Sequence, residues 1–283
     1  RFPYYVDTYG FHTIHGRAPT IATGLAVSRP DLQVWVVTGD GDGLSIGGNH
    51  LIHCLRRNVD IKILLFNNEI YGLTKGQYSP TSEQGKRTKS SPMGSVEEPM
   101  KPLYTAIAAG ATFAARAVAT DSKHLQEVLM RAARHRGSAF VEIFQNCNVF
   151  NDGTFDHFIA REVKDERTLY LEHDQPLRLG RDREHMLCID SSGGGITPVV
   201  RAVDGACEGA PVVHDEKANP NYLARFLAQM NERELPVPLG VYQAINKPTY
   251  GELLDEQVVS AMAERGRGSL IDYLHQGDTW EVN

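Results

Sequence analysis

Residues 36–48 read Val-Val-Thr-Gly-Asp-Gly-Asp-Gly-Leu-Ser-Ile-Gly-Gly, so that two aspartates stand between glycines at the end of an apolar run. Glycines allow a ligand to approach the backbone closely, and carboxylate oxygens bind hard metal ions. A phosphate ligand with its metal ion, a calcium loop, and a plain turn between a strand and a helix are all compatible with this stretch. Spacing along the chain distinguishes among them.

Two alternatives fail on spacing. A dinucleotide-binding fingerprint needs a glycine at its sixth position. That position is occupied by Leu44 if the motif starts at Gly39 and by Ile46 if it starts at Gly41. An EF-hand loop that starts at Asp40 needs an oxygen ligand at its fifth position and a glutamate at its twelfth, where this chain has Leu44 and Leu51. A glycine-rich turn without a ligand remains open.

A second polar pair favours the phosphate ligand. The 25 residues 42–66 separate Gly41 from Asn67-Asn68, and Gly-Asp-Gly followed at this distance by Asn-Asn is the signature of thiamine-diphosphate-binding proteins. A strand, a helix and a strand would bring the two loops side by side. Asp40 and Asn68 could then place oxygens on one Mg²⁺ whose other positions take diphosphate oxygens. Backbone N–H groups and a helix N-terminus would face the phosphates.

The segments around these loops have the pattern of buried parallel strands. Residues 32–37 and 61–66 are short, nearly continuous apolar runs, and residues 49–57 between them have helical spacing. A second unit comprises strands at 111–119 and 138–144. Alternating strands and helices predict an α/β fold, with a mostly parallel sheet and helices on both faces. Ligands of such sheets bind beyond the carboxyl ends of the strands, where both loops lie.

The clearest helix lies within the second unit. Its apolar residues recur on one face between residues 125 and 133, Asp121 or Ser122 can cap its start, and Gly137 ends it. The end of another helix is expected at residues 106–109.

The pattern changes after about residue 150. Charged and Ser-Gly-rich stretches alternate there with two short amphipathic helices, expected near residues 222–230 and 250–263. We therefore predict a cofactor-binding domain at residues 1–165 and an irregular C-terminal extension at residues 166–283, which packs on the domain and on a partner subunit.

Composition excludes other classes. The 283 residues are 41% hydrophobic and carry a formal charge of −6, which gives no basic field for nucleic acid, and no apolar run is long enough to cross a membrane. The four cysteines are far apart and form no CxxC pair. This pattern favours a reducing compartment over a disulfide framework and predicts a cytoplasmic protein. The chain opens on Arg1, and we expect that a segment upstream of it has been removed or omitted.

Several motifs together resemble the β subunit of 2-oxoacid:ferredoxin oxidoreductases, most of all the branch that uses 2-oxoglutarate. The likeness covers residues 1 to about 165, and the eleven residues that begin at Asn67 are its most specific part. The motifs are Arg-Phe-Pro-Tyr-Tyr at 1–5, His-Gly-Arg-Ala at 15–18, Gly-Asp-Gly-Asp-Gly at 39–43, Asn-Asn-Glu-Ile-Tyr-Gly-Leu-Thr-Lys-Gly-Gln at 67–77 and Ser-Pro-Thr at 79–81.

The resemblance implies a set of cofactor-binding residues. Magnesium would be held by Asp40, Asn68 and the backbone carbonyl of Ile70. Contacts with the diphosphate or the thiazolium ring of thiamine diphosphate would come from His15, Gly41, Asp42, Gly72 and Leu73.

The resemblance also implies a [4Fe-4S] cluster, and here the chain departs from the family pattern. Three of the family's four cluster cysteines would precede Arg1 and have no match. The fourth matches Cys147. A small buried hydrophobic side chain is the alternative for Cys147 and the expectation for Cys54, while Cys188 and Cys207 are expected to be structural.

The function implied by the resemblance is oxidative decarboxylation of a 2-oxoacid to an acyl-coenzyme A and CO₂, or the reverse reaction, with ferredoxin as electron acceptor. An α subunit would complete the active site by forming a heterodimer with this chain, and two such heterodimers would form the complete enzyme. Arg1 and Leu73 would line the substrate pocket, where the guanidinium could bind the distal carboxylate of 2-oxoglutarate. Pyruvate and branched-chain 2-oxoacids remain possible substrates. Alternatives are a non-oxidative decarboxylase or acetolactate-type enzyme, which needs no Cys147, and a catalytically inactive scaffold subunit.

Overall fold

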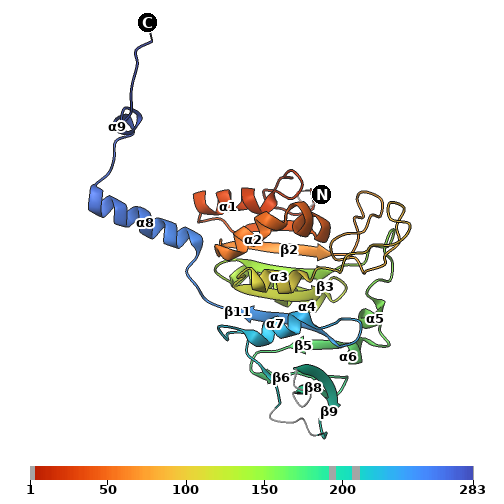
Figure 1. Cartoon of the computed structure of the whole chain (residues 1–283). Helices are drawn as coiled ribbons and strands as arrows, with labels where there is room; N and C mark the ends of the chain where they lie inside the picture. The colour runs from red at the N-terminus through yellow and green to blue at the C-terminus, as the bar shows by residue number, and fades with distance from the viewer. Residues whose placement is uncertain (1–3, 191–195, 206–210, 283) are drawn as a thin grey trace.

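The computed structural model describes residues 4–190, 196–205 and 211–282. Its centre is a six-stranded sheet with the order β1-β2-β4-β3-β11-β5 (Figure 1). The strands are β1 (Val34–Gly39), β2 (Ile61–Asn67), β3 (Phe113–Val118), β4 (Ala139–Phe144), β5 (Thr168–Leu171), β6 (Gln175–Pro176), β7 (Arg178–Leu179), β8 (His185–Asp190), β9 (Thr197–Ala202), β10 (Val213–His214) and β11 (Val237–Ala244).

Helices lie before the first of these strands, between them and after the last. They are α1 (Ala18–Ser28), the short π-helix η2 (Asp42–Ile46), α2 (Gly48–Arg56), α3 (Pro102–Ala108), α4 (Ser122–Arg134), α5 (Asp156–Ile159), α6 (Lys164–Arg167), α7 (Tyr222–Gln229), α8 (Tyr250–Arg265) and α9 (Leu270–Leu274).

The four strands predicted from hydrophobic pattern are all present and pair in parallel. β1 pairs with β2, β2 with β4, and β4 with β3. All residues of β3 and β4 are buried, as strands covered on both faces must be. The helix predicted between β3 and β4 is α4, and the carboxylate of Asp121 caps it by accepting a hydrogen bond from the N–H of His124 at 3.3 Å.

Two apolar layers enclose the sheet. The larger packs α1, α2, α3 and α7 against one face, with side chains such as Leu51, Leu103 and Leu227 in contact with the strands. The other packs α4 against the opposite face through Val128 and Ala132. The predicted α/β fold with helices on both faces is therefore confirmed.

The C-terminal half contains strands that the sequence pattern did not reveal. β11 pairs antiparallel with β3 and parallel with β5, so residues beyond 165 extend the same sheet. β8 pairs antiparallel with β7 and with β9 in a separate small sheet. The expected helices near residues 222 and 250 are α7 and α8. The predicted domain boundary at residue 165 stays a prediction.

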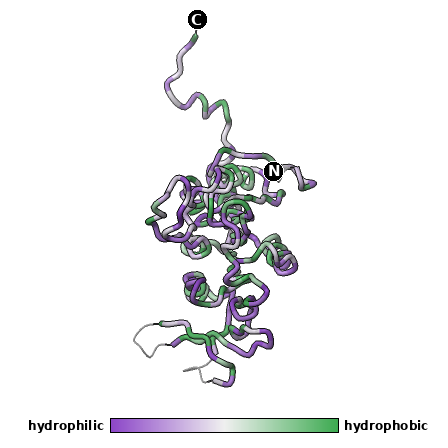
Figure 2. The backbone as a smooth tube through the Cα atoms, turned by 90° about the vertical axis from the view of Figure 1, so that its right-hand side faces the viewer, coloured by the Kyte–Doolittle hydropathy of each residue, from purple (hydrophilic) through white to green (hydrophobic). Residues whose placement is uncertain are grey.

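A C-terminal arm leaves the body of the molecule after β11 (Figures 1 and 2). It contains α8 and α9, and neither helix has a buried residue. Figure 2 shows hydrophobic residues among hydrophilic ones along this arm. Trp280, near its end, is 83% exposed. Within the described part of the chain, no helix has the length and apolar character that crossing a membrane requires.

One expectation about the cysteines was wrong. Cys188, in β8, is bonded in a disulfide, whereas the sequence pattern argued against disulfides. A disulfide requires two segments to meet in space at a suitable separation, which spacing along the chain does not encode. Cys207 lies outside the described residues. Cys54 is a free cysteine in the core, as predicted, and burial raises the pKa of its thiol to about 12.

A buried ion pair lies in the middle of the sheet. Nε of Arg116, on β3, is 2.9 Å from the carboxylate of Glu142 on β4, and both side chains are at most 1% exposed. A second carboxylate, that of Glu232, lies 3.1 Å from the same guanidinium, which also donates to the hydroxyl of Tyr242 on β11 at 3.3 Å. Burial acts to lower the pKa of Arg116, but the neighbouring carboxylates outweigh it and raise that pKa. The guanidinium is therefore charged.

We predict that Glu142→Ala lowers the free energy of unfolding by about 3 kcal/mol, because the charge on Arg116 stays buried after its nearest carboxylate is removed. Urea-induced unfolding measures the change. The double variant Arg116→Met/Glu142→Leu removes both charges and should lose less stability than the single variant. Wild-type stability in Glu142→Ala would contradict this interpretation.

Candidate functional site

The site lies where β1 and β2 end. Gly39 pairs with Phe66 in the parallel ladder, so Asp40, which follows β1, and Asn67, which ends β2, lie side by side where two loops begin. Asp40 is only 2% exposed. The strand ends, rather than contacts between the helices, thus bring together the two motifs that are 25 residues apart in the sequence.

Two hydroxyl groups hold the carboxylate of Asp40. Oγ of Ser79 and Oγ1 of Thr81 donate hydrogen bonds to its Oδ2 at 2.6 and 2.7 Å. Burial raises the pKa of Asp40, and the two hydroxyl donors counteract that rise. No lysine, arginine or histidine of the described residues forms an ion pair with this carboxylate. A buried carboxylate with oriented donors and no protein cation fits a bound divalent cation.

The two asparagines of the second loop have different partners. Nδ2 of Asn67 donates to Oε1 of Glu142 at 2.9 Å, and its Oδ1 accepts from Oγ1 of Thr81 at 3.0 Å. Both ends of the Asn67 amide are therefore hydrogen-bonded within the protein, and this side chain anchors the loop to the sheet. Oδ1 of Asn68 accepts only a long hydrogen bond, 3.3 Å, from the N–H of Ile70. This bond orients the amide of Asn68 and leaves lone-pair capacity on its oxygen for a metal ion.

The rest of the second loop is held in a tight turn. Glu69 has a positive φ of 55°, and burial raises the pKa of its carboxyl to about 7. The carbonyl of Ile70, a predicted magnesium ligand, accepts a hydrogen bond from the N–H of Gly72 at 3.0 Å. From the loop after β4, Asn151 donates its side-chain N–H to the carbonyl of Asn68 at 2.9 Å.

Asp42 connects the glycine loop to the His15-Gly16 segment. Its Oδ1 accepts a hydrogen bond from the N–H of Gly16 at 2.7 Å and lies 2.5 Å from Nδ1 of His15. Oγ1 of Thr38 donates to its Oδ2 at 2.6 Å. Both carboxylate oxygens are thus used within the protein. Asp42 positions His15, and any contact of Asp42 with a phosphate would use its backbone N–H.

Glycine is needed at Gly41 because of a neighbouring ring. Its φ of −66° is open to any residue, but a Cβ on Gly41 would lie 2.1 Å from Cε1 of Tyr71. The hydroxyl of Tyr71 donates to the carbonyl of Gly41 at 3.0 Å, so the tyrosine ties the second loop to the first.

Cys147 also meets the second loop. A Cβ on Gly72 would lie 3.3 Å from the sulfur of Cys147. Cys147, which follows β4, is therefore a direct neighbour of the loop after β2. It is a free cysteine of intermediate exposure. Leu73, which follows Gly72 in the sequence, is 100% exposed. The structure therefore brings Asp40, Asn68, Gly72 and Cys147 to one end of the sheet, while Arg1 lies outside the described residues.

The sequence analysis missed several residues of the site. Tyr71, Ser79 and Thr81 were noted as parts of motifs without a role, and no role was considered for Glu142 and Asn151. A glutamate within the apolar run 139–144 was the one available signal, because a charge in a strand buried on both faces requires a partner.

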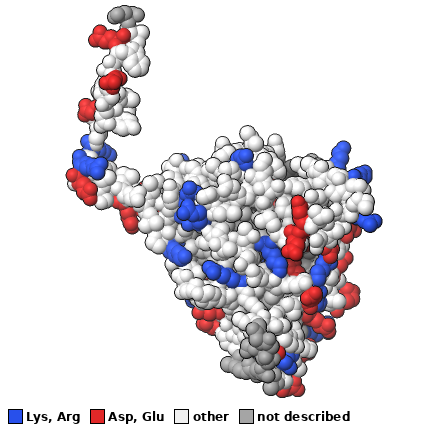
Figure 3. Space-filling view, viewed as in Figure 1, with Lys and Arg blue, Asp and Glu red and all other residues white. Residues whose placement is uncertain are grey.

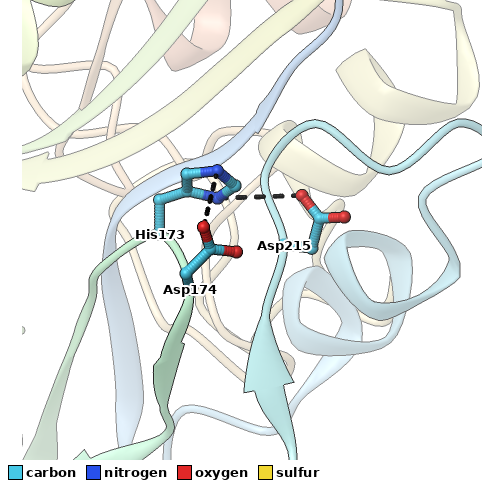
Figure 4. Close-up of side chains that lie close together, drawn as sticks. All are labelled: His173, Asp174 and Asp215. Atoms are coloured by element: carbon cyan, nitrogen blue, oxygen red, sulfur yellow. Dashed lines mark ion pairs between the residues drawn. The ribbon is translucent and has the colours of Figure 1, made fainter.

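A separate polar cluster follows β5, the edge strand at the opposite end of the sheet order from β1. Figure 4 shows its side chains, His173, Asp174 and Asp215. Nε2 of His173, after β5, is 3.4 Å from the carboxylate of Asp174, and its Nδ1 is 3.7 Å from the carboxylate of Asp215. These three side chains could hold a metal ion by their mutual distances. They also pair with one another, which connects the segments after β5 and β10.

Comparisons with known proteins agree with this geometry. Residues 1–143 match the family model described as thiamine pyrophosphate enzyme, C-terminal TPP binding domain. The chain is 51% identical over its whole length to the 2-oxoglutarate oxidoreductase subunit KorB of Mycobacterium tuberculosis, of which it covers 75%. It is 43% identical over 58% of its length to the 2-oxoacid:ferredoxin oxidoreductase subunit beta of Saccharolobus solfataricus, of which it spans about half, 52%.

A solved structure extends the likeness to the fold. The chain superimposes with a TM-score of 0.72 and 32% identity on 2-oxoglutarate:ferredoxin oxidoreductase from Magnetococcus marinus with 2-oxoglutarate, coenzyme A and succinyl-CoA bound, over 97% of this chain and 77% of the other. The chain belongs to the thiamine-diphosphate-binding β subunits of 2-oxoacid oxidoreductases. The glycine loop and the asparagine loop both lie within the residues that match the TPP binding domain.

We predict that Gly41→Ala destabilises this β subunit by about 1–3 kcal/mol, because the added methyl group must displace the ring of Tyr71. In a Tyr71→Ala background, where the ring is absent, the same substitution should cost much less. Chemical unfolding of the four proteins of this cycle measures the coupling. Equal costs in both backgrounds would show that Tyr71 is not the reason for glycine at position 41.

Proposed function

We propose that this chain is the thiamine-diphosphate subunit of an oxidoreductase that decarboxylates 2-oxoglutarate to succinyl-coenzyme A and CO₂, with ferredoxin as electron acceptor. The observation that carries the proposal is the buried carboxylate of Asp40, which has no cationic partner among the described residues and accepts a hydrogen bond at 2.7 Å from the hydroxyl of Thr81. The same hydroxyl also bonds Asn67. The names of the mycobacterial and magnetococcal relatives support the choice of substrate.

In this proposal the metal ligands are Asp40, Asn68 and the carbonyl of Ile70. Ser79 and Thr81 orient the carboxylate before the ion arrives, which reduces the cost of ordering the site on binding. The carbonyl of Ile70 accepts one hydrogen bond within the loop, and a carbonyl oxygen has a second lone pair for a metal ion.

The phosphate and ring contacts come from both loops. Backbone N–H groups at Gly41 and Asp42 face the diphosphate at the start of a helical segment, with His15 held beside them by Asp42. Gly72 and Leu73 face the thiazolium ring. When bound, thiamine diphosphate supplies a nucleophilic carbon and an electron sink for decarboxylation, and a [4Fe-4S] cluster takes the electrons one at a time.

Cys147 is the proposed cluster ligand of this chain. A sulfur next to Gly72 would place a cluster beside the thiazolium end of the cofactor, which is the position that rapid electron transfer requires. The other ligands would be supplied from outside residues 1–283. The α subunit, in a dimer of heterodimers, would supply the group that activates the aminopyrimidine ring.

Substrate selection is proposed for Arg1 and Leu73. The guanidinium of Arg1 would bind the distal carboxylate of 2-oxoglutarate in a two-pronged manner, and Leu73 would pack against the methylene chain. The full exposure of Leu73 in the isolated chain leaves its side chain open to such a contact.

We predict that Asp40→Asn and Asn68→Leu each abolish Mg²⁺-dependent binding of thiamine diphosphate to the assembled enzyme, because each removes an oxygen ligand from the metal. Titration calorimetry measures binding, and circular dichroism should report an unchanged fold. Asp255→Asn, on the exposed helix α8, is the matched control and should bind as the wild type does. Unchanged cofactor affinity in either site variant would refute the assignment.

We predict that Cys147→Ser in the assembled enzyme abolishes reduction of ferredoxin and preserves release of CO₂ from 2-oxoglutarate, because the electrons lose their exit and the decarboxylation site stays intact. Cys54→Ala, at a buried free cysteine, is the control and should retain both activities. If the electron paramagnetic resonance signal of the reduced cluster is unaltered in Cys147→Ser, Cys147 is not a ligand. Wild-type enzyme that releases CO₂ without ever reducing ferredoxin would instead support a non-oxidative decarboxylase.

A further inference from the structure

The C-terminal arm begins at a fixed point on the body of the molecule. Thr249 and Glu252 cap the first turn of α8, each with its side chain on the backbone N–H of the other. The N–H of Tyr250 donates to the carbonyl of Asn58 at 3.2 Å, and the carboxylate of Glu252 lies 2.6 Å from Nη2 of Arg136. These contacts set the direction in which α8 leaves the body (Figure 1).

Beyond this first turn the arm is uncovered. Every residue from 255 to 282 is exposed, and nine of them have large apolar side chains. In α9, Leu270, Tyr273 and Leu274 lie on one side of the helix, and Asp272 lies on the other. Because short helices are marginally stable alone in water and exposed apolar groups mark protein–protein contacts, we expect another surface to cover this arm.

The arm is also acidic. Residues 255–282 carry six carboxylate side chains and two arginines, a formal net charge of −4 within a chain whose total is −6. None of these six carboxylates forms an ion pair with a described residue. Figure 3 shows Asp and Glu side chains along the arm, and Lys and Arg side chains on the body near the point where the arm leaves it. A surface that covers the arm should therefore be both apolar and positively charged.

A cationic concavity lies beside the start of the arm. It has a volume of about 810 Å³, and its lining includes Arg131, Arg134, Lys247 and, from the first turn of α8, Glu252. Arg131 pairs with a carboxylate of the same chain at 2.5 Å. Among the described residues, no carboxylate pairs with Arg134 or Lys247, so both cations are open to an acidic partner.

An apolar face adjoins these cations. Trp35 and Val37, on the edge strand β1, point away from the sheet face that α1 and α2 cover, and they are 37% and 36% exposed. Nε1 of Trp35 donates to Oε1 of Gln33 at 3.0 Å, and Nε2 of Gln33 donates to the carbonyl of Ala133 in α4 at 2.9 Å. The exposed strand face therefore meets the last turns of α4, where Met130 is 47% exposed.

We propose that two copies of this chain exchange their C-terminal arms. Each arm lies across the acceptor face of the other copy, which is formed by Trp35, Val37, Met130, Arg134 and Lys247. The apolar side of α9 packs on the tryptophan, the valine and the methionine, and carboxylates of the arm pair with the two cations. The proposal names the surface that joins two copies in the dimer of heterodimers, and it rests on that part of the proposed function.

A second copy fits the arm better than the arm's own chain does. α8 is 16 residues long, so it carries α9 about 24 Å away from the acceptor face beside its own start. If two α8 helices lie antiparallel with the two-fold axis at their middle, the end of each lies beside the start of the other. Each α9 then reaches the acceptor face of the other copy, and two identical contacts close the dimer. An α subunit would need a basic and apolar surface of its own, whereas this chain already carries one.

Photo-crosslinking in the assembled enzyme tests this proposal. The variant Tyr273→p-benzoylphenylalanine carries the crosslinker on α9, and the enzyme is assembled from a mixture of unlabelled and isotope-labelled copies of the chain. We expect crosslinks to peptides that contain Trp35 or Met130, and mass spectrometry should find a light chain joined to a heavy one. The control Tyr222→p-benzoylphenylalanine, at an exposed tyrosine of α7, should give no such product.

Charge reversal tests the electrostatic part of the contact. Arg134→Glu/Lys247→Glu should lower the yield of the crosslink between copies about tenfold, because the acidic arm then meets charges of its own sign. Asp272→Lys/Asp278→Lys, added to the same chain, should restore the yield.

The control Lys123→Glu/Arg225→Glu makes the same change of charge at exposed positions of α4 and α7 and should leave the yield unchanged. Three results overturn the proposal: products joined only within one chain, products joined to the α subunit, and no product with the acceptor face. Enzyme that oxidises 2-oxoglutarate without a crosslink between copies would refute the arm exchange and leave the proposed function standing. Crosslinked copies that oxidise no 2-oxoacid would do the reverse.

Discussion

The side chain of Asn67 connects the core of the sheet to the cofactor site. Its amide donates to Glu142, which pairs with Arg116, and its oxygen accepts from Thr81, which also donates to Asp40. Every partner in this chain is buried, so an error at one position leaves a charge or a polar group unpaired at the next. The position of the Asp40 carboxylate, the proposed metal ligand, therefore depends on the ion pair between Arg116 and Glu142.

The same constraint explains why residues beyond 165 matter to the site. Tyr242, on β11, and Glu232 both contact the guanidinium of Arg116. The antiparallel pairing of β11 with β3 places Tyr242 there, and Glu232 lies in the turn that precedes β11. Residues of the C-terminal half thus stabilise the buried Arg116 on which the candidate site depends. None of the described residues of that half was predicted to contact the cofactor.

Three loops meet at one end of the sheet. The loops after β1 and β2 carry the proposed metal and phosphate ligands, and the loop after β4 brings Cys147 to Gly72 and Phe150 to Gly76. Because neighbouring parallel strands end on the same edge, the proposed metal ligands and the proposed cluster ligand both border the asparagine loop.

The sequence by itself determined the four parallel strands, α4 with its cap, and the pair of loops headed by Asp40 and Asn67-Asn68, because hydrophobic period and motif spacing are local properties of the chain. Only the tertiary structure decided which asparagine is an anchor and which is free for metal, that Ser79 and Thr81 hold Asp40, and that β11 completes the sheet. The disulfide at Cys188 is another feature that only the tertiary structure decided. These features depend on which distant segments meet, and that is set by packing and by the need to pair every buried polar group.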